Sequence, residues 1–214
     1  MSRPRLYVFD WDGTLIDSVP RIVQCLRLAA VDAGLPLLGD AEYGDVIGLG
    51  LPQAIATLYP SIDEALALTY RDRYADRFIE ADVEPSGFFD GVLQTLETLK
   101  AEGHLLAVAT GKSRRGLDRV MGRHGLQGFF HATRCADETA SKPDPLMLHQ
   151  VFEELSVTPD EALMVGDSEF DLAMAARAGV RSVGVSYGVH APERLQRHGP
   201  ERIIASIREL LAWP

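Results

Sequence analysis

Cysteine is scarce in this sequence, with only two residues, Cys25 and Cys135, among 214. Neither lies in a CxxC pair, so the chain lacks the patterns typical of zinc sites and disulfide-rich secreted domains. A chain of this length buries roughly 70% of its unfolded surface and needs no disulfide or zinc site to stabilise its fold. We expect two reduced, buried thiols in preference to one long-range disulfide.

Long hydrophobic runs are also missing. The longest unbroken apolar stretches, such as residues 105–109, are far shorter than the ~18 residues that cross a bilayer. The opening residues, MSRPRLYVFD, reach an aspartate after four apolar residues and contain no signal-peptide core. We therefore predict a cytoplasmic protein with no membrane partner.

Positive charge is in short supply. The chain has 21 Lys and Arg against 31 Asp and Glu, a formal net charge of −10 at pH 7. Such a field repels nucleic-acid phosphates, and the densest basic run is only the pair Arg114 and Arg115, so we predict no nucleic-acid partner. The remaining composition, 46% hydrophobic and 24% charged, is ordinary for a globular protein and excludes a disordered chain.

Short apolar runs predict the strands of an α/β fold. Each run ends at a polar or glycine-containing turn, which suits strands buried on both faces of a parallel sheet. The runs are residues 6–9, 105–109, 162–165 and 183–185, with 132–135 as a weaker candidate. Helical stretches alternate with them from residue 85 onward, which predicts a Rossmann-like sheet with right-handed crossovers.

Capping residues mark the helices of this part. Ser113 is a predicted N-cap, and either Asp167 or Ser168 is another. Pro143 and Pro145 are predicted to lie in the first turn of a helix that reaches residue 155.

Residues 16–84 break the alternation and contain no convincing strand. Their apolar spacing predicts helices over residues 19–33, 52–58 and 62–79. We therefore predict a core formed by residues 1–15 and 85–214, with an all-α domain inserted as residues 16–84.

The strongest local signal is the stretch DWDGTL, residues 10–15, directly after the first predicted strand. Ligands of open α/β sheets bind at the carboxyl ends of the strands, where Asp10 and Asp12 can both face the crevice. One carboxylate can then act as nucleophile and the other as general acid/base, with a cation relieving their repulsion. Taken alone, the pair fits a solvent-exposed acidic turn better.

Three more strand ends carry suitable groups. Thr110 and Gly111 offer a hydroxyl and a backbone amide that can hold phosphoryl oxygens. Lys142 begins the next helical stretch, and Asp167 and Asp171 place two carboxylates after a fourth strand. Each has an ordinary alternative: helix capping for Thr110, Asp167 and Asp171, and a solvated surface charge for Lys142.

Together these motifs resemble the haloacid dehalogenase-like superfamily. DWDGT, Thr110, Lys142 and GDSEFD occur in its order and context, and the helical insert falls where its phosphoglycolate phosphatase-like branch places a cap domain. The resemblance covers essentially the whole chain. It implies an α/β Rossmann-like core with an inserted helical cap.

The resemblance also implies roles. Asp10 would attack phosphorus to form an aspartyl-phosphate, and Asp12 would protonate the leaving alkoxide and then activate water. Thr110, with the amide of Gly111, would hold the phosphoryl group. Lys142 would neutralise Asp10 and the phosphoryl oxygens.

A metal site is part of the same resemblance. Mg²⁺ would bind the side chains of Asp10 and Asp167 and the backbone carbonyl of Asp12, with Asp171 acting through metal-bound water or by orienting Lys142. Hard oxygen donors without histidine or cysteine favour Mg²⁺ over Zn²⁺. Without cations, a phosphate dianion would meet several carboxylates and be excluded.

Asp12 separates the reaction classes of this superfamily. A halide leaving group needs no proton, whereas an alkoxide does, so Asp12 favours phosphoryl transfer over dehalogenation. The predicted cap contains no lysine, which argues against imine chemistry. We predict a Mg²⁺-dependent phosphatase for a small phosphorylated metabolite, with 2-phosphoglycolate as candidate, and a monomer or homodimer. A pyrophosphatase, a phosphomutase and a catalytically silent binding protein are the alternatives.

The cap carries Gly48 and Gly50 in the stretch GLGL, residues 48–51. This loop either hangs over the site and contacts substrate or is a plain turn between helices, and the two interpretations are equally favoured. Gly111 departs from the family pattern, since many phosphoglycolate phosphatases have asparagine there. That departure weakens the inference, drawn from the resemblance, that 2-phosphoglycolate is the substrate of this chain.

Overall fold

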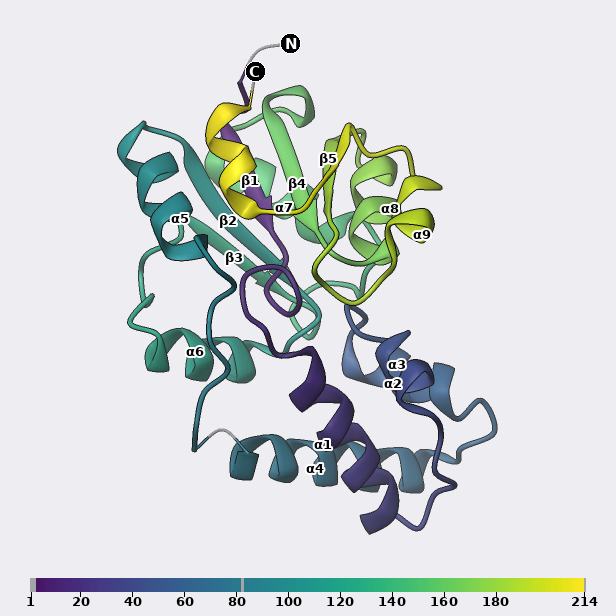
Figure 1. Cartoon of the computed structure of the whole chain (residues 1–214). Helices are drawn as coiled ribbons and strands as arrows, with labels where there is room; N and C mark the ends of the chain where they lie inside the picture. The colour runs from purple at the N-terminus through teal and green to yellow at the C-terminus, as the bar shows by residue number, and fades with distance from the viewer. Residues whose placement is uncertain (1–2, 82, 214) are drawn as a thin grey trace.

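The computed structural model describes residues 3–81 and 83–213 and contains a six-stranded parallel sheet (Figure 1). The order of the strands across the sheet is β3-β2-β1-β4-β5-β6. The strands are β1 (Leu6–Phe9), β2 (Leu105–Thr110), β3 (Ala132–Cys135), β4 (Ala162–Gly166), β5 (Arg181–Val185) and β6 (Arg202–Ile204). All strands run in one direction, so their carboxyl ends share one edge of the sheet, and the predicted Rossmann-like class is confirmed.

The position of β1 decides where the chemistry can lie. β1 is in the middle of the sheet, fully buried, and its Phe9 is in register with Val108 of β2 and Val165 of β4. The next residue, Asp10, donates its backbone N–H to the carbonyl of Val165 at 2.9 Å. The residues that follow β1, β2 and β4 are therefore neighbours in space.

The sheet is covered by helices of the same part of the chain. They are α5 (Val92–Ala101), α6 (Arg114–Arg123), α7 (Leu146–Leu155), α8 (Glu169–Arg177) and α9 (Pro192–Gln196), with 3-10 helices η1 (Pro159–Glu161) and η2 (Ile207–Ala212). Leu6 and Val8 of β1 belong to a core shared with α7 and α8. Tyr7 and Phe9 point to the opposite face, into a core shared with α5, α6 and η2. Because both faces are covered, the central strands β1, β2 and β4 are nearly continuous apolar runs.

A second group of helices lies beyond the carboxyl edge of the sheet (Figure 1). It consists of α1 (Val19–Asp32), α2 (Asp40–Gly44), α3 (Leu51–Leu58) and α4 (Glu64–Ala81). α1 packs along α4, where the buried Tyr70 donates its hydroxyl to the carbonyl of Leu26 at 2.9 Å. The helical character expected for residues 16–84 is present, while the limits of a separate cap domain stay a prediction. Residues 1, 2, 82 and 214, which those limits include, lie outside the described residues.

Several local predictions differ from the structure. β6 was not expected, because it is only three residues long and begins with an exposed arginine. The five-residue α2 is also an addition. α7 begins at Leu146, so the prediction of Pro143 and Pro145 within its first turn is wrong. The Asp144 carboxylate accepts the N–H of Leu146 at 2.9 Å and so satisfies a free amide at the beginning of this helix.

Both cysteines are free and buried, as expected. Burial raises the pKa of Cys25 to about 11 and that of Cys135 to about 12. Within the described part of the chain, no helix is long and apolar enough to cross a membrane.

Candidate active site

Four sequence motifs meet at the carboxyl edge of the sheet. Asp10 follows β1, Thr110 ends β2, Asp167 follows β4, and Lys142 comes from the segment between β3 and α7. Each of these side chains is at most 1% exposed. Buried charges and hydroxyls are costly unless they are paired. The alternatives given above, helix caps and a solvated surface lysine, therefore do not account for these four residues.

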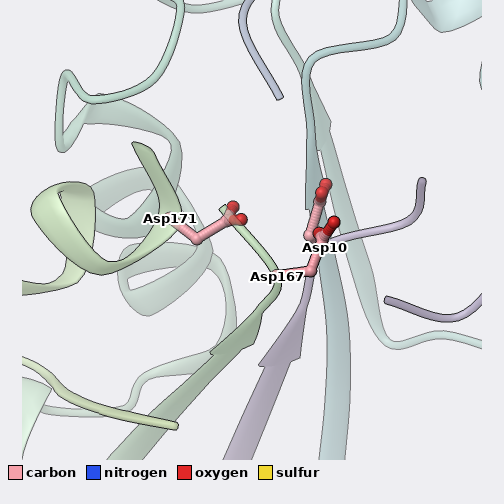
Figure 2. A group of neighbouring side chains, drawn as sticks. All are labelled: Asp10, Asp167 and Asp171. Carbon is pink, nitrogen blue, oxygen red and sulfur yellow. The ribbon is translucent and has the colours of Figure 1, made fainter. Parts of the chain in front are cut away.

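The three aspartates Asp10, Asp167 and Asp171, here called the acidic cluster, face one another. One carboxylate oxygen from each lies within 4.8 Å of the others, and Figure 2 shows Asp171 reaching from α8 toward the other two. Burial raises the pKa of Asp10 well above its usual value, although Lys142 acts against the shift. Burial and the charge of Asp171 raise the pKa of Asp167 to about 7.

The acidic cluster fits a divalent cation. Its donors are all carboxylate oxygens, the hard ligands that Mg²⁺ prefers, and no histidine or cysteine belongs to the group. Burial raises the pKa values of both Asp10 and Asp167, so the site by itself disfavours the charged form of these carboxylates. A bound cation would supply the missing positive charge.

Lys142 joins two members of the cluster. Its Nζ lies 2.6 Å from Oδ1 of Asp10 and 2.6 Å from Oδ1 of Asp171, and its side chain has no solvent exposure. Burial acts to lower the pKa of Lys142, but the charges of Asp10 and Asp171 outweigh that effect and raise it. The lysine is therefore held charged between them, and Asp171 fixes its orientation.

A tight turn brings Asp167 against the loop after β1. Gly13 has φ +80°, and a Cβ there would lie 2.1 Å from Oδ2 of Asp167, so only glycine fits. Thr14 donates its hydroxyl to Oδ1 of Asp167 at 2.9 Å, and the backbone N–H of Val189 donates to Oδ2 at 2.8 Å. Ser168, rather than Asp167, is the N-cap of α8, which leaves the Asp167 carboxylate in the cluster.

Asp12 lies apart from the acidic cluster and has its own partners. Its Oδ1 accepts the hydroxyl of Ser18 at 2.6 Å, and its Oδ2 lies 3.0 Å from Nζ of Lys112. Ser18 begins the connection to the cap, and Lys112 follows the β2 motif. Neither was predicted from the sequence, although Lys112 stands only two residues after Thr110.

The cap loop around Gly48 and Gly50 contacts the core directly. The backbone N–H of Gly50 donates to the hydroxyl of Ser141 at 2.8 Å. A Cβ on Gly111 would lie 2.5 Å from the carbonyl oxygen of Leu49 and 2.8 Å from that of Gly48. The absence of a side chain at Gly111 therefore permits the close approach of the cap loop, which gives this departure from the family pattern a structural reason.

A cavity of about 530 Å³ opens between the core and the cap helices. Asp10, Asp12 and Gly111 line its core side, and Gly48 lines it from the cap loop, while Gly50 is not among its lining residues. The cap side is mostly apolar and includes Ile22, Leu26, Val46, Ile47, Tyr74 and Phe78. The arrangement places the carboxylates of Asp10 and Asp12 on the core side of a partly open cavity whose cap side is mostly apolar.

Comparison with known proteins agrees with this geometry. The family model described as haloacid dehalogenase-like hydrolase matches residues 7–185. The chain is 30% identical to phosphoglycolate phosphatase of Vibrio vulnificus, over 97% of this chain and 94% of that one. It is 32% identical to probable phosphatase IndB of Dickeya dadantii, over 96% and 91% of the two chains.

Solved structures show the same fold. A predicted phosphoglycolate phosphatase from Haemophilus somnus superposes with a TM-score of 0.89 at 25% identity, covering 99% of this chain and 98% of that one. A predicted phosphatase from Clostridium acetobutylicum gives 0.86 at 27% identity, covering 98% and 97%. The chain belongs to the haloacid dehalogenase-like hydrolase family. Within that family it is a phosphatase of the phosphoglycolate phosphatase-like type.

Proposed function

We propose that the protein is a Mg²⁺-dependent phosphatase that hydrolyses a small phosphomonoester through an aspartyl-phosphate on Asp10. The observation that carries the proposal is the buried acidic cluster with Lys142 held between Asp10 and Asp171. A merely structural carboxylate cluster would not need a further carboxylate, that of Asp12, in the lining of the same cavity as Asp10. We propose 2-phosphoglycolate as the first substrate to test, from the similarity to phosphoglycolate phosphatases.

The metal site would use Asp10 and Asp167 through their side chains and Asp12 through its backbone carbonyl. When bound, Mg²⁺ would neutralise the carboxylates and the phosphoryl oxygens. Asp171 would act by holding Lys142, with which it makes a 2.6 Å ion pair. Thr110, the amide of Gly111 and Lys142 would bind the phosphoryl oxygens.

The chemistry would proceed in two displacements at phosphorus. A carboxylate oxygen of Asp10 forms a bond to phosphorus while the ester P–O bond breaks, and Asp12 gives its proton to the leaving alkoxide. Asp12 then takes a proton from water, whose oxygen attacks phosphorus and releases inorganic phosphate and the Asp10 carboxylate. Ser18 and Lys112 hold the Asp12 side chain for these transfers.

The remaining parts of the proposal concern organisation. Residues 1–15 and 85–214 would form the catalytic core and residues 16–84 the cap, which would open for substrate and close to exclude water. The partner would be a small phosphorylated metabolite, bound by a cytoplasmic monomer or homodimer.

Phosphate release from a panel of esters tests the proposal. The panel holds 2-phosphoglycolate, pyrophosphate and an aryl phosphate, each with Mg²⁺ and with chelator. We expect metal-dependent release, a loss of at least about 10³-fold in kcat for Asp10→Asn, and normal release for the matched exposed variant Asp160→Asn. Release that survives chelation, or Asp10→Asn at near-normal turnover, would contradict the proposal.

A further inference from the structure

One wall of the cavity carries three basic side chains that the proposed chemistry does not use to bind phosphate. Lys112, Arg115 and Arg119, here called the α6 wall, all line the same cavity as Asp10. Arg115 and Arg119 are four residues apart on α6, so they lie on one face of the helix. The same cavity is also lined by Asp137 on the core side and by Arg71 and Asp72 of α4, which form an ion pair with each other.

The three charges are not equally matched within the protein. Lys112 is paired with Asp12 at 3.0 Å. Its Nζ lies 4.6 Å from the centre of the Phe78 ring, and the guanidinium carbon of Arg119 lies 5.6 Å from the same ring. Arg115 is exposed and lines the cavity, and no hydrogen bond or ion pair to it is found within residues 3–81 and 83–213, so its guanidinium is open to a ligand or to solvent.

The cavity is also larger than glycolate requires. Cavities of about 300–1,000 Å³ hold drug-sized ligands, and this one measures about 530 Å³. That volume is found with the cap in contact with the core. Arg194 of α9 lies 2.6 Å from Asp45 of the cap, and Gly50 donates to Ser141. A two-carbon acid at Asp10 would leave most of this space filled by water alone.

We propose that the α6 wall binds a second anionic group, a carboxylate or a phosphate, at the far end of a leaving group longer than glycolate. The inference rests on the proposed phosphatase function. A guanidinium binds a carboxylate or phosphate through two parallel hydrogen bonds, which suits Arg115 and Arg119. Lys112 shares its charge with Asp12 and so lies nearer the scissile bond. The apolar cap residues would cover the carbon chain between the two anions.

Substrates of graded length test the inference. Phosphate release is measured with Mg²⁺ for phosphorylated ω-hydroxy acids that begin with 2-phosphoglycolate and lengthen by one methylene at a time. Each acid is compared with the alkyl phosphate of equal length, and alkanediol bisphosphates provide the arm with a terminal phosphate. For at least one chain length greater than that of glycolate, we expect kcat/KM for the ester with a terminal anion to be at least tenfold higher than kcat/KM for the alkyl phosphate of equal length.

Substitutions in the α6 wall test whether its arginines cause the preference for esters with a terminal anion. In Arg115→Gln and Arg119→Gln, kcat/KM for the best charged ester should fall at least ten times more than for its uncharged match, mainly through KM. Arg115→Lys should recover part of the ratio. Arg123→Gln removes a charge from the same helix at a position outside the cavity lining, and it should leave both values within twofold.

The outcomes separate this inference from the proposed function. Equal rates for charged and uncharged esters at every length, or a peak at 2-phosphoglycolate that the arginine variants leave unchanged, would overturn the inference while the phosphatase stands. Equal losses on both classes of ester would show a general structural role and would also overturn it. No release from any ester would overturn the proposed function, and the inference with it.

Discussion

The core side of the cavity and its cap side are built from opposite kinds of side chain. On the core side, Asp10 lines the cavity. Asp10 and its neighbours Asp167, Asp171 and Lys142, which are not lining residues, are almost completely buried, and each is held by charged or hydrogen-bonded partners. On the cap side, the lining is largely aliphatic and aromatic, and the ring of its Phe78 lies against Lys112 and Arg119 of the core side.

The difference separates two tasks. A buried charged network has one arrangement that satisfies all its members, so it suits a reaction that never changes. An apolar surface contacts any carbon skeleton that fits, so it suits selection among leaving groups. The same sheet edge can therefore serve several substrates if only the cap side changes.

The largest effect that would sharpen this comparison is expected from Lys142→Met. Removing the ammonium leaves Asp10 and Asp171 buried without their common partner, which we expect to cost about 3–5 kcal/mol in the free energy of unfolding. Lys112→Met should cost clearly less, because Asp12 keeps the hydrogen bond from Ser18. Urea unfolding of both variants measures the difference, and equal losses would show that the two lysines lie in equivalent environments.

Mg²⁺ should stabilise the core side in particular. At a concentration 100 times its Kd, a ligand specific for the folded state adds about 2.7 kcal/mol, which raises Tm by several degrees. Asp167→Asn should abolish the rise, while the exposed Asp160→Asn keeps it. Thermal unfolding with and without Mg²⁺ measures both, and an unchanged rise in Asp167→Asn would place the metal elsewhere.

Gly111→Ala tests the contact between the two sides. The new methyl group would press on the carbonyl oxygens of Leu49 and Gly48, and relief of that overlap is expected to cost about 1–3 kcal/mol and to raise KM. Gly87→Ala is the matched control, since a Cβ there meets nothing within 4 Å. If Gly111→Ala behaves like the control in urea unfolding and in KM, the loop does not depend on this close approach.

The reactivity of the two cysteines allows the mobility of the cap to be compared with that of the core. This is the smallest of the expected effects. Cys25 is buried in α1 of the cap, and Cys135 is buried at the end of β3. The pKa of Cys25 is raised to about 11 and that of Cys135 to about 12, so both react slowly near neutral pH. We expect iodoacetamide to modify Cys25 about tenfold faster, because of its lower pKa and easier opening of the cap. Peptide mass analysis over time gives the two rates, and faster labelling of Cys135 would contradict the expectation.

The sequence predicted the core side better than the cap side for a physical reason. Asp10, Thr110 and Asp167 follow apolar runs that can only be buried strands, and parallel strands bring their ends together. β6 was missed because three residues carry no periodic signal. On the core side, Lys112, Arg115 and Arg119 were also missed, because charges near or on a helix usually face solvent, and only the position of the cap helices turns this face into a cavity wall.

The central claim is that Asp10 carries the phosphoryl group during turnover. The direct measurement is acid quenching of the enzyme while it hydrolyses an aryl phosphate with Mg²⁺, followed by peptide mass analysis. The account predicts one phosphoryl group on the peptide that contains Asp10, and none in Asp10→Asn. A phosphoryl group on any other residue, or steady turnover by Asp10→Asn, would contradict it.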